Sequence, residues 1–354
     1  MELKRYKLGE ILELQRGYDL PSSQQKAGNV LVAGSNGIIG YHNEIRGNHP
    51  CITVGRSGSV GKVHYYEQPT WAHNTALFVK DFKGNNPQYL YYFLKNLHLD
   101  EMFVKGSSVV PSLDRKVVHS LVVPFHKEVV CQKRIALVLS NIDRKIELNR
   151  AINQNLEAMA KLLYDYWFVQ FDFPNENGKP YKSSGGKMVW NKKIKREIPE
   201  GWKEVTLNAF IDKNKAGDWG YDIPKDGTIK VGCVRGADII KLNDVPTRYI
   251  TSKHSDRLLE DGDIVIEISG GSPVQATGRV ALITNGVIGR NGGALVCSNF
   301  CQSFNMKKRE FSEYFYYLWQ NLYDNGNMFN FEGKTSGIKT VSYTHLRAHE
   351  TSQD

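Results

Sequence analysis

Hydrophobic spacing defines one long helix near the middle of the chain. No Gly or Pro interrupts residues 127–171, where apolar residues recur at alternating spacings of three and four. This is the a/d pattern of a heptad repeat, sustained over about four heptads, and it predicts an α-helix roughly 60 Å long. Asn149 falls on an a position and Lys145 on a d position, where polar side chains typically fix register and partner number. The predicted pairing seam consists of Ile135, Val138, Ile142, Asn149, Ile152, Leu156, Met159 and Leu163.

The 126 residues before this helix have a different pattern. Short apolar runs and Gly-rich turns predict one strand followed by a Gly-rich turn in 28–40, two strands around a glycine loop in 51–66, and another strand in 75–82. Residues 86–103 have helical spacing, with an aromatic face and Pro87 near the start. Short strands with a few helices predict an α+β, β-rich domain over 1–126.

The chain after the helix repeats this organisation. Residues 172–197 are rich in Pro, Gly, Ser, Asn and Lys, which predicts a linker. The block 198–341 then carries short segments that match the first block in the same order. We therefore predict two similar mixed β-rich domains joined by one long heptad-repeat α-helix. The matched segments are 61–63 with 278–280, 74–79 with 291–296, 89–97 with 314–322, and 106–108 with 333–335.

The last residues, 342–354, carry no heptads and include the run SYTHLRAHET. This run resembles a translated sequencing adaptor, so we expect an artefactual or disordered tail. We also expect the natural sequence to depart from this chain near Val341, with a C-terminal portion missing. A genuine short polar tail is the alternative.

Composition narrows the possible functions. The formal net charge is +9 and the pI about 9.1, which suits a polyanionic partner such as nucleic acid. The five cysteines are scattered, which does not fit a disulfide framework, and a metal site is not predicted. The charged N-terminus is no signal peptide, and no apolar run approaches the ~20 residues that cross a bilayer. We expect a cytoplasmic protein without a membrane partner.

The sequence departs from known catalytic and cofactor-binding motifs at identifiable positions. The loop GRSGSVGK, residues 55–62, lacks the Walker spacing, since Arg56 stands where its first Gly belongs and Val63 follows Lys62. The sequence has no Asn/Asp-Pro-Pro-Tyr/Phe methyltransferase motif. Asp263 and Glu267 are the closest approach to a nuclease motif, but its Lys is missing, and we interpret both as exposed strand residues. Aromatic residues at 89–93 and 314–319 could stack on bases, although a core role is favoured. We predict a non-enzyme with no cofactor.

Together, these segments resemble the specificity (S) subunit of type I restriction–modification systems. The resemblance rests on YKLGEILEL (6–14), GRSGSVGKV (55–63), QYLYYFLKN (88–96), the helix end LLYDYWFVQFDFP (162–174) and IPEGWKEVTL (198–207). It implies that each domain reads one half of a bipartite sequence in double-stranded DNA. It further implies that the helix sets the spacing and docks methyltransferase (modification) subunits, through which a restriction subunit joins. S-adenosylmethionine, ATP and Mg²⁺ would act on those partners. In the family two long helices pack antiparallel, and this chain departs from that pattern after residue 341.

Candidate DNA contacts are polar and basic residues in or near the glycine loops. Backbone N–H groups and basic side chains in such turns can hold a phosphate or reach a base edge. A structural scaffold that binds only protein is the alternative function. The candidates are Arg56, Ser57, Ser59, Lys62, Asn74, Lys105, Ser107, Ser108 and Arg115 in the first block, and Ser269, Ser272, Arg279, Arg290, Asn291, Lys334, Thr335 and Lys339 in the second.

Overall fold

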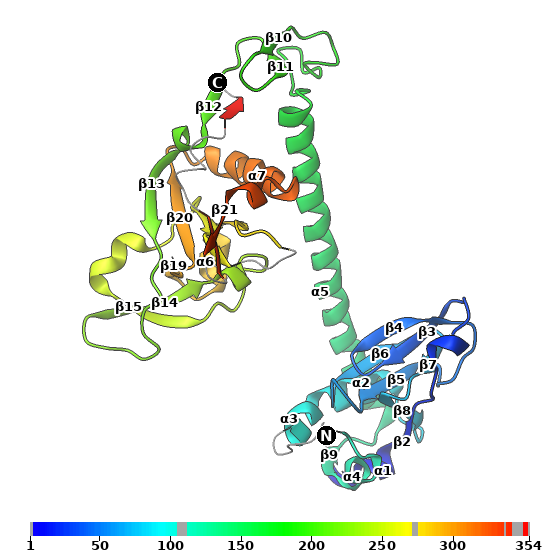
Figure 1. Cartoon of the computed structure of the whole chain (residues 1–354). Coiled ribbons are helices and arrows are strands. Elements are labelled where there is room, and N and C mark those ends of the chain that lie inside the picture. Colours follow the sequence, from blue (N-terminus) through cyan, green and yellow to red (C-terminus); the bar gives the residue numbers. More distant parts are fainter. Residues whose placement is uncertain (1–2, 105–111, 271–274, 336–337, 342–349, 353–354) are drawn as a thin grey trace. The chain divides into compact units, whose positions relative to one another are not determined.

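The computed structural model describes residues 3–104, 112–270, 275–335, 338–341 and 350–352. The chain divides into two compact units, 1–153 and 154–354, drawn in Figure 1. The fold is mixed α+β, with several small sheets and one long helix. Each unit is described by itself.

Two facing sheets form the centre of the first unit. The four-stranded antiparallel sheet has the order β2-β8-β5-β6, and the three-stranded sheet has the order β4-β3-β7, with β3 parallel to β7. A separate pair joins β1 to β9. The strands are β1 (Lys4–Lys7), β2 (Glu13–Arg16), β3 (Val30–Gly34), β4 (Gly37–His42), β5 (Cys51–Gly55), β6 (Val63–Tyr66), β7 (Thr70–Ala72), β8 (Ala76–Asp81) and β9 (Val122–Phe125).

Strand β5 shows why this unit has a core on both faces of one sheet. Successive strand side chains point to opposite faces. Ile52 and Val54 therefore pack with helix α2, while Cys51 packs with β3 and β7 of the other sheet. All of β5 is buried, which explains its continuous apolar run.

The helix predicted over 86–103 is two helices, α2 (Pro87–Asn96) and α3 (Leu99–Val104). Asn86 caps α2 by accepting from the Tyr89 N–H at 2.8 Å, with Pro87 in the first turn. His98 has a φ of +48°, which ends the helical path between them. The other short helices of this unit are α1 (Leu8–Ile11), α4 (Arg115–Ser120) and the 3₁₀ turn η1 (Ser22–Gln24).

The second unit also carries a four-stranded and a three-stranded sheet. Their orders are β13-β20-β16-β18 and β15-β14-β19, with β14 parallel to β19; β17-β22-β21 form a further sheet. Its strands are β10 (Met188–Asn191), β11 (Arg196–Pro199), β12 (Glu204–Thr206), β13 (Ile211–Ala216), β14 (Thr228–Val234), β15 (Thr247–Thr251), β16 (Ile264–Glu267), β17 (Ser269–Gly270), β18 (Val280–Leu282), β19 (Leu295–Cys297), β20 (Cys301–Met306), β21 (Glu332–Thr335), β22 (Ile338–Val341) and β23 (Glu350–Ser352).

Helix α7 (Phe311–Asp324) covers one face of the four-stranded sheet of this unit (Figure 1). Phe315 and Trp319 are buried there, and the Trp319 indole donates to the Gly278 carbonyl at 2.7 Å. The aromatic run at 314–319 thus contributes to the core, as does Tyr89 in α2. The remaining helical elements are α6 (Asn285–Arg290), η3 (Leu207–Ala209), η4 (Gly236–Asp238), η5 (Ser252–Arg257) and η6 (Asn327–Phe331).

One of the segment matches expected from the sequence is wrong. Residues 74–79 lead into β8, which lies between β2 and β5 in a four-stranded sheet. Residues 291–296 lead instead into β19, an edge strand of a three-stranded sheet. Short apolar strands resemble one another in sequence, so letter matching alone selected a strand with different neighbours.

Helix α5 (Val129–Tyr164) is continuous and ends in a π-helical turn, η2 (Asp165–Val169). In the first unit Gln132 anchors its start: the buried side chain donates to Asn85 Oδ1 and the His126 carbonyl, both at 2.8 Å, and accepts from the Asn86 N–H at 2.9 Å. In the second unit Tyr164 is buried and packs against Tyr314 and Tyr317. Both ends of α5 are therefore part of a core.

The segment predicted as a linker, 172–197, has a defined structure. Phe173 stacks between Tyr181 and Trp202, and β10 pairs with β11. Asp172 accepts hydrogen bonds from the backbone and hydroxyl of Ser183. The low hydrophobic periodicity concealed this packing, which uses three rings rather than an apolar stripe.

Part of the predicted disordered tail also pairs as a strand. Glu350–Ser352 form β23, antiparallel to β12. The candidates Lys105, Ser107, Ser108 and Ser272 lie outside the described residues.

Replacing Gln132 with Leu tests how the start of α5 is held. The substitution removes the hydrogen bonds of three buried or half-buried polar groups, each loss costing about 1–3 kcal/mol before relaxation. We expect the first unit to lose about 2–3 kcal/mol of unfolding free energy, measured by urea denaturation with circular dichroism. Gln154→Leu, at an exposed site of the same helix, is the matched control and should change stability by less than about 0.5 kcal/mol. Equal effects of the two substitutions would contradict the anchoring role.

Candidate nucleic-acid interface

A polar hollow of about 600 Å³ gathers three arginines in the first unit. Arg16 comes from the end of β2, Arg56 from the turn after β5, and Arg115 from the start of α4. Arg115 and Arg16 are exposed, whereas Arg56 is half-buried. Two of these arginines were predicted from the sequence; the fold adds Arg16.

Backbone contacts hold the loop that carries Arg56. The Arg56 N–H donates to the Thr75 carbonyl at 2.9 Å, its guanidinium donates to the Asn74 carbonyl at 3.3 Å, and its own carbonyl accepts from Leu113. Ser57 forms an isolated bridge with Ser112. Gly55 permits this turn, because a Cβ there would lie 1.9 Å from the Ser59 carbonyl oxygen. The loop presents Arg56 in a fixed orientation.

Other candidates near this hollow are engaged by neighbours. Asn74 donates to Asp19, which also lies 3.6 Å from Arg16. Lys62 is exposed and donates to Asn36 at 2.9 Å. These exposed contacts are weak in water, so each cationic side chain can exchange its partner for a phosphate.

Sequence reasoning missed Arg16 because it lies outside the glycine loops. The available signal was a basic residue ending a strand just before Gly17. A Cβ at Gly17 would lie 2.2 Å from the His73 carbonyl oxygen, so the chain must pass close to β7 there. Burial lowers the pKa of His73 beside this crossing, which favours the neutral ring.

In the second unit Arg279 is bound internally. Its guanidinium donates to both oxygens of Glu267, at 2.7 and 3.0 Å, and this pairing raises the pKa of Arg279. Glu267 is 2% exposed. A Cβ on Gly236 or Gly270 would lie 2.6 Å from Glu267 Oε1, so these glycines leave room for the carboxylate. We interpret the glycines around this strand end as accommodating an ion pair.

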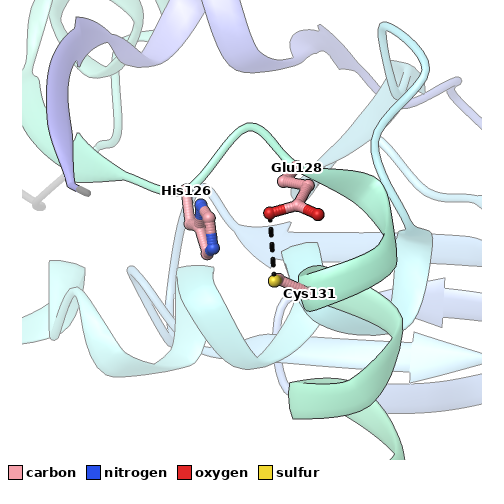
Figure 2. Close-up of side chains that lie close together, drawn as sticks. All are labelled: His126, Glu128 and Cys131. Atoms are coloured by element: carbon pink, nitrogen blue, oxygen red, sulfur yellow. Dashed lines mark hydrogen bonds between the residues drawn. The ribbon is translucent and has the colours of Figure 1, made fainter. Parts of the chain in front are cut away.

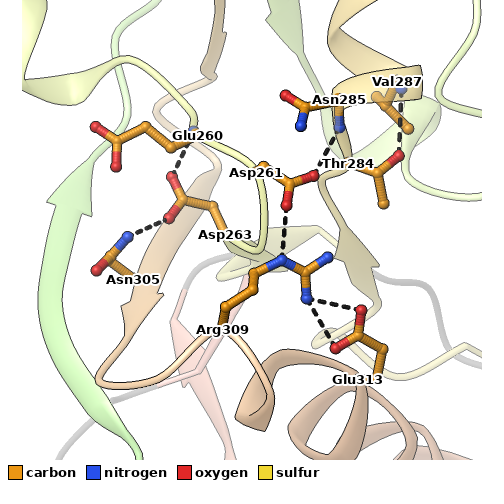
Figure 3. A network of polar contacts seen from close by, with 9 residues as sticks. All are labelled: Glu260, Asp261, Asp263, Thr284, Asn285, Val287, Asn305, Arg309 and Glu313. Atoms are coloured by element: carbon orange, nitrogen blue, oxygen red, sulfur yellow. Dashed lines mark hydrogen bonds and ion pairs between the residues drawn. The ribbon is translucent and has the colours of Figure 1, made fainter.

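Asp263 is likewise buried, so the expectation that Asp263 and Glu267 are exposed strand residues is wrong. Asp263 accepts from Lys215 Nζ and the Glu260 N–H at 2.9 Å and from Asn305 at 3.0 Å. Figure 3 shows this carboxylate between Glu260 and Asn305. The alternation of polar and apolar residues could not reveal this burial, because β16, which begins directly after Asp263, is buried on both faces. Both acids have cationic partners and serve structure.

The same network extends to the start of α7. Arg309 bridges Asp261 and Glu313 through contacts of 2.7 Å, and Asp261 also accepts from the Asn285 N–H (Figure 3). The hydrogen bond from Arg309 lowers the pKa of Asp261. This network ties α6 and α7 to the loop before β16.

The remaining candidates of the second unit are not gathered into one described hollow. Asn291 donates to the Leu242 and Val287 carbonyls and accepts from the Val245 N–H, so its amide is used internally. Arg290 is exposed at the end of α6, and Ser269 is half-buried in β17. Lys334, Thr335 and Lys339 fall on β21 and β22, without described side chains.

The predicted helix seam is largely exposed. All side chains from Arg144 to Met159 are exposed. Ile135 differs, because it packs against the core of the first unit. The other apolar seam residues and their relative exposures are Val138 59%, Ile142 51%, Ile152 52%, Leu156 57%, Met159 64% and Leu163 46%; Asn149 is exposed too.

Residues 2–158 match the family model of the type I restriction modification DNA specificity domain. This part of the chain belongs to that family. The resemblance to type I specificity subunits is thereby confirmed. The type I restriction enzyme MjaIX specificity subunit of Methanocaldococcus jannaschii is 31% identical over 126 residues, covering 35% of this chain and 27% of that protein. The HindI specificity subunit of Haemophilus influenzae is 49% identical over 41 residues, covering 12% of this chain and 9% of that protein.

A solved structure extends the likeness in fold. The type I restriction–modification S subunit from M. genitalium has a TM-score of 0.58 and 14% identity, covering 99% of this chain and 84% of that one. Sequence alignment spans only about a quarter of the M. jannaschii specificity subunit. In the part of the chain that the structure describes, no helix is both long enough and apolar enough to span a membrane.

Replacing Glu267 with Gln tests the buried ion pair. Removing the carboxylate charge leaves Arg279 without its counter-ion, so we expect a loss of about 3 kcal/mol of unfolding free energy in the second unit. Tryptophan fluorescence during urea unfolding would measure it, since Trp202 and Trp319 lie in this unit. Glu200→Gln removes the exposed partner of Lys187 and should cost at most about 1 kcal/mol. Equal losses would show that the buried Glu267–Arg279 pair stabilises the unit no more than an exposed ion pair does.

Proposed function

We propose that this protein is the DNA sequence-recognition subunit of a type I restriction–modification complex. Each of its two domains reads one half of a bipartite site in double-stranded DNA. Helix α5 sets the spacing of the half-sites and docks methyltransferase subunits, and the restriction subunit joins through them. The subunit itself is non-catalytic and acts in the cytoplasm. The observation that carries this proposal is the specificity-domain match of residues 2–158.

Strand order supports the idea of two similar domains. The two four-stranded sheets, β2-β8-β5-β6 and β13-β20-β16-β18, connect their strands in the same order along the chain. The two three-stranded sheets, β4-β3-β7 and β15-β14-β19, also correspond. The parallel pair falls at the same place in both units. One aromatic helix, α2 or α7, packs on the four-stranded sheet in each unit. A duplicated domain accounts for all three features.

The charge and the arginine hollow support DNA as the ligand. Arginines can contact phosphates and form bidentate hydrogen bonds to guanine. Arg16, Arg56 and Arg115 reach one hollow from three elements, so they can contact one stretch of backbone together. The net charge of +9 favours a polyanion over a protein of ordinary composition.

The exposed seam supports a docking role for α5. Its apolar residues recur at heptad spacing on one side of a helix that is anchored at both ends. Burial of exposed apolar side chains contributes roughly 25 cal/mol per Å². A partner helix or a methyltransferase subunit would gain that free energy by covering Ile142, Ile152 and Leu156.

DNA binding is tested with duplexes containing randomised bipartite sites, in the presence of the methyltransferase subunit. Sequence-dependent retention at ~100 mM salt is expected, because specific binding exceeds non-specific binding by orders of magnitude. The absence of sequence-dependent retention would contradict DNA sequence recognition, and no retention of any duplex would favour the protein-only scaffold. Methyl transfer by the purified chain alone would contradict its non-catalytic role.

Arg115→Ala should weaken DNA binding and reduce the steepness of its salt dependence by about one counterion. Arg115 is exposed, so the fold should tolerate the change. Arg5→Ala, at an exposed site on β1, is the control and should leave the salt dependence unchanged. Identical salt dependences for wild type and Arg115→Ala would remove the hollow from the DNA interface.

Leu156→Asp and Ile142→Asp should reduce co-elution with the methyltransferase subunit by at least about tenfold, since each places a charge at an apolar interface. Both residues are exposed in this chain, so its own fold should persist. Gln154→Asp, on the opposite face of the same helix, is the control. Unchanged assembly of both seam variants would mean that the seam is no interface.

A further inference from the structure

Three potential metal ligands converge where β9 leads into α5. His126 follows the last residue of β9, Glu128 immediately precedes α5, and Cys131 lies in its first turn. One ligand atom from each lies within 4.8 Å of the others. Figure 2 shows the three side chains facing one another, with the Cys131 thiol donating to Glu128 at 3.2 Å.

The surrounding hydrogen bonds hold the backbone of this cluster. Gln132 donates through its side chain to the His126 carbonyl at 2.8 Å, and through its N–H to the Glu128 carbonyl at 3.0 Å. A single buried residue thus fixes two of the three ligand-bearing positions. Metal sites depend on such outer contacts to orient their ligands.

His126 supplies an independent indication of a ligand. It is 8% exposed, and its Nε2 is buried without a hydrogen-bond partner among the described residues. Buried polar atoms normally have partners, and an exception calls for an explanation such as an ion. A thiol and a carboxylate lie beside this imidazole, and these three groups are all metal ligands. A metal ion would therefore account for the unpartnered nitrogen.

We propose that His126, Glu128 and Cys131 bind one Zn²⁺ ion, with water as the fourth ligand. Nitrogen, oxygen and sulfur are the three donor types that zinc accepts in tetrahedral sites, at about 2.0–2.3 Å. Two ligands of such a site lie roughly 3.5 Å apart. The Cys131–Glu128 separation of 3.2 Å is already close to this value, and the three ligand atoms all lie within 4.8 Å of one another.

Binding exchanges one proton for the metal. Zn²⁺ forms a bond to Cys131 Sγ, and the thiol proton leaves to solvent. Glu128, which accepts that proton's hydrogen bond and raises the pKa of Cys131, becomes an oxygen ligand. Zinc would therefore link the end of β9 to the first turn of α5, stabilising the junction from which the helix begins. This inference does not depend on the proposed function.

Cobalt substitution tests the site directly. The full chain, freed of metal with a chelator, is titrated with Co²⁺ and then Zn²⁺. We expect one equivalent to bind, with a thiolate-to-cobalt charge-transfer band and intense tetrahedral d–d bands that Zn²⁺ abolishes. Zn²⁺, but not Mg²⁺, should also slow alkylation of Cys131 at least tenfold; the other four cysteines are buried and provide the internal reference.

Substitutions keep the test specific. Cys131→Ser should abolish the charge-transfer band, while His126→Gln and Glu128→Gln should each weaken Zn²⁺ binding at least tenfold. The matched control is the exposed pair His98 and Glu101, 3.8 Å apart on the same unit, replaced as His98→Gln with Glu101→Gln; its affinity should stay at the wild-type value. Circular dichroism checks that each variant is folded. Zn²⁺ that fails to protect Cys131 in wild type, or binds all variants equally, overturns the proposal.

Discussion

The anchoring of helix α5 at both ends is the constraint on which the other features depend. A long helix with a modest apolar side is marginal in water unless tertiary contacts hold it. Here Gln132 bonds three groups of the first unit, and Tyr164 packs into aromatic rings of the second. These contacts leave the residues between them, Arg144 to Met159, exposed. The apolar seam is therefore available to a partner without loss of either core.

Each unit achieves its stability by the same physical arrangement. A central strand, β5 or β16, sends alternate side chains to a helix on one face and a small sheet on the other. This double burial removes the polar alternation that usually distinguishes a half-exposed strand. It also brings charged residues inside, where Glu267 and Asp263 are retained through cationic partners. Removing one member of such a pair is costly, whereas the exposed arginines of the first unit can exchange partners freely.

Much of the fold could be predicted from the sequence, because the local spacing of apolar residues and glycines determines which segments form helices and strands. The glycine-free heptads indicated α5, and the apolar runs at 51–66 and 75–82 indicated strands that the structure contains. Arg56 and Arg115 could be selected by their basic character near turns, but Arg16 could not, because its neighbours in the hollow are distant in sequence. The alignment of 74–79 with 291–296 was wrong because the neighbours of a strand are set by the tertiary arrangement of the sheet, which the local sequence does not encode. The ion pair of Arg279 could not be predicted either, since its partner Glu267 lies at the end of β16, in a different element of the fold.

The sequence by itself determined the α+β class, the long central helix and the likeness to specificity subunits, because these depend on periodicity and on ordered local motifs. The tertiary structure decided which charges are buried, which arginines meet, and that residues 172–197 fold around stacked rings. It also brought His126, Glu128 and Cys131 together at the start of α5. The physical reason is that burial and pairing depend on contacts between residues far apart in the chain, which no local pattern encodes.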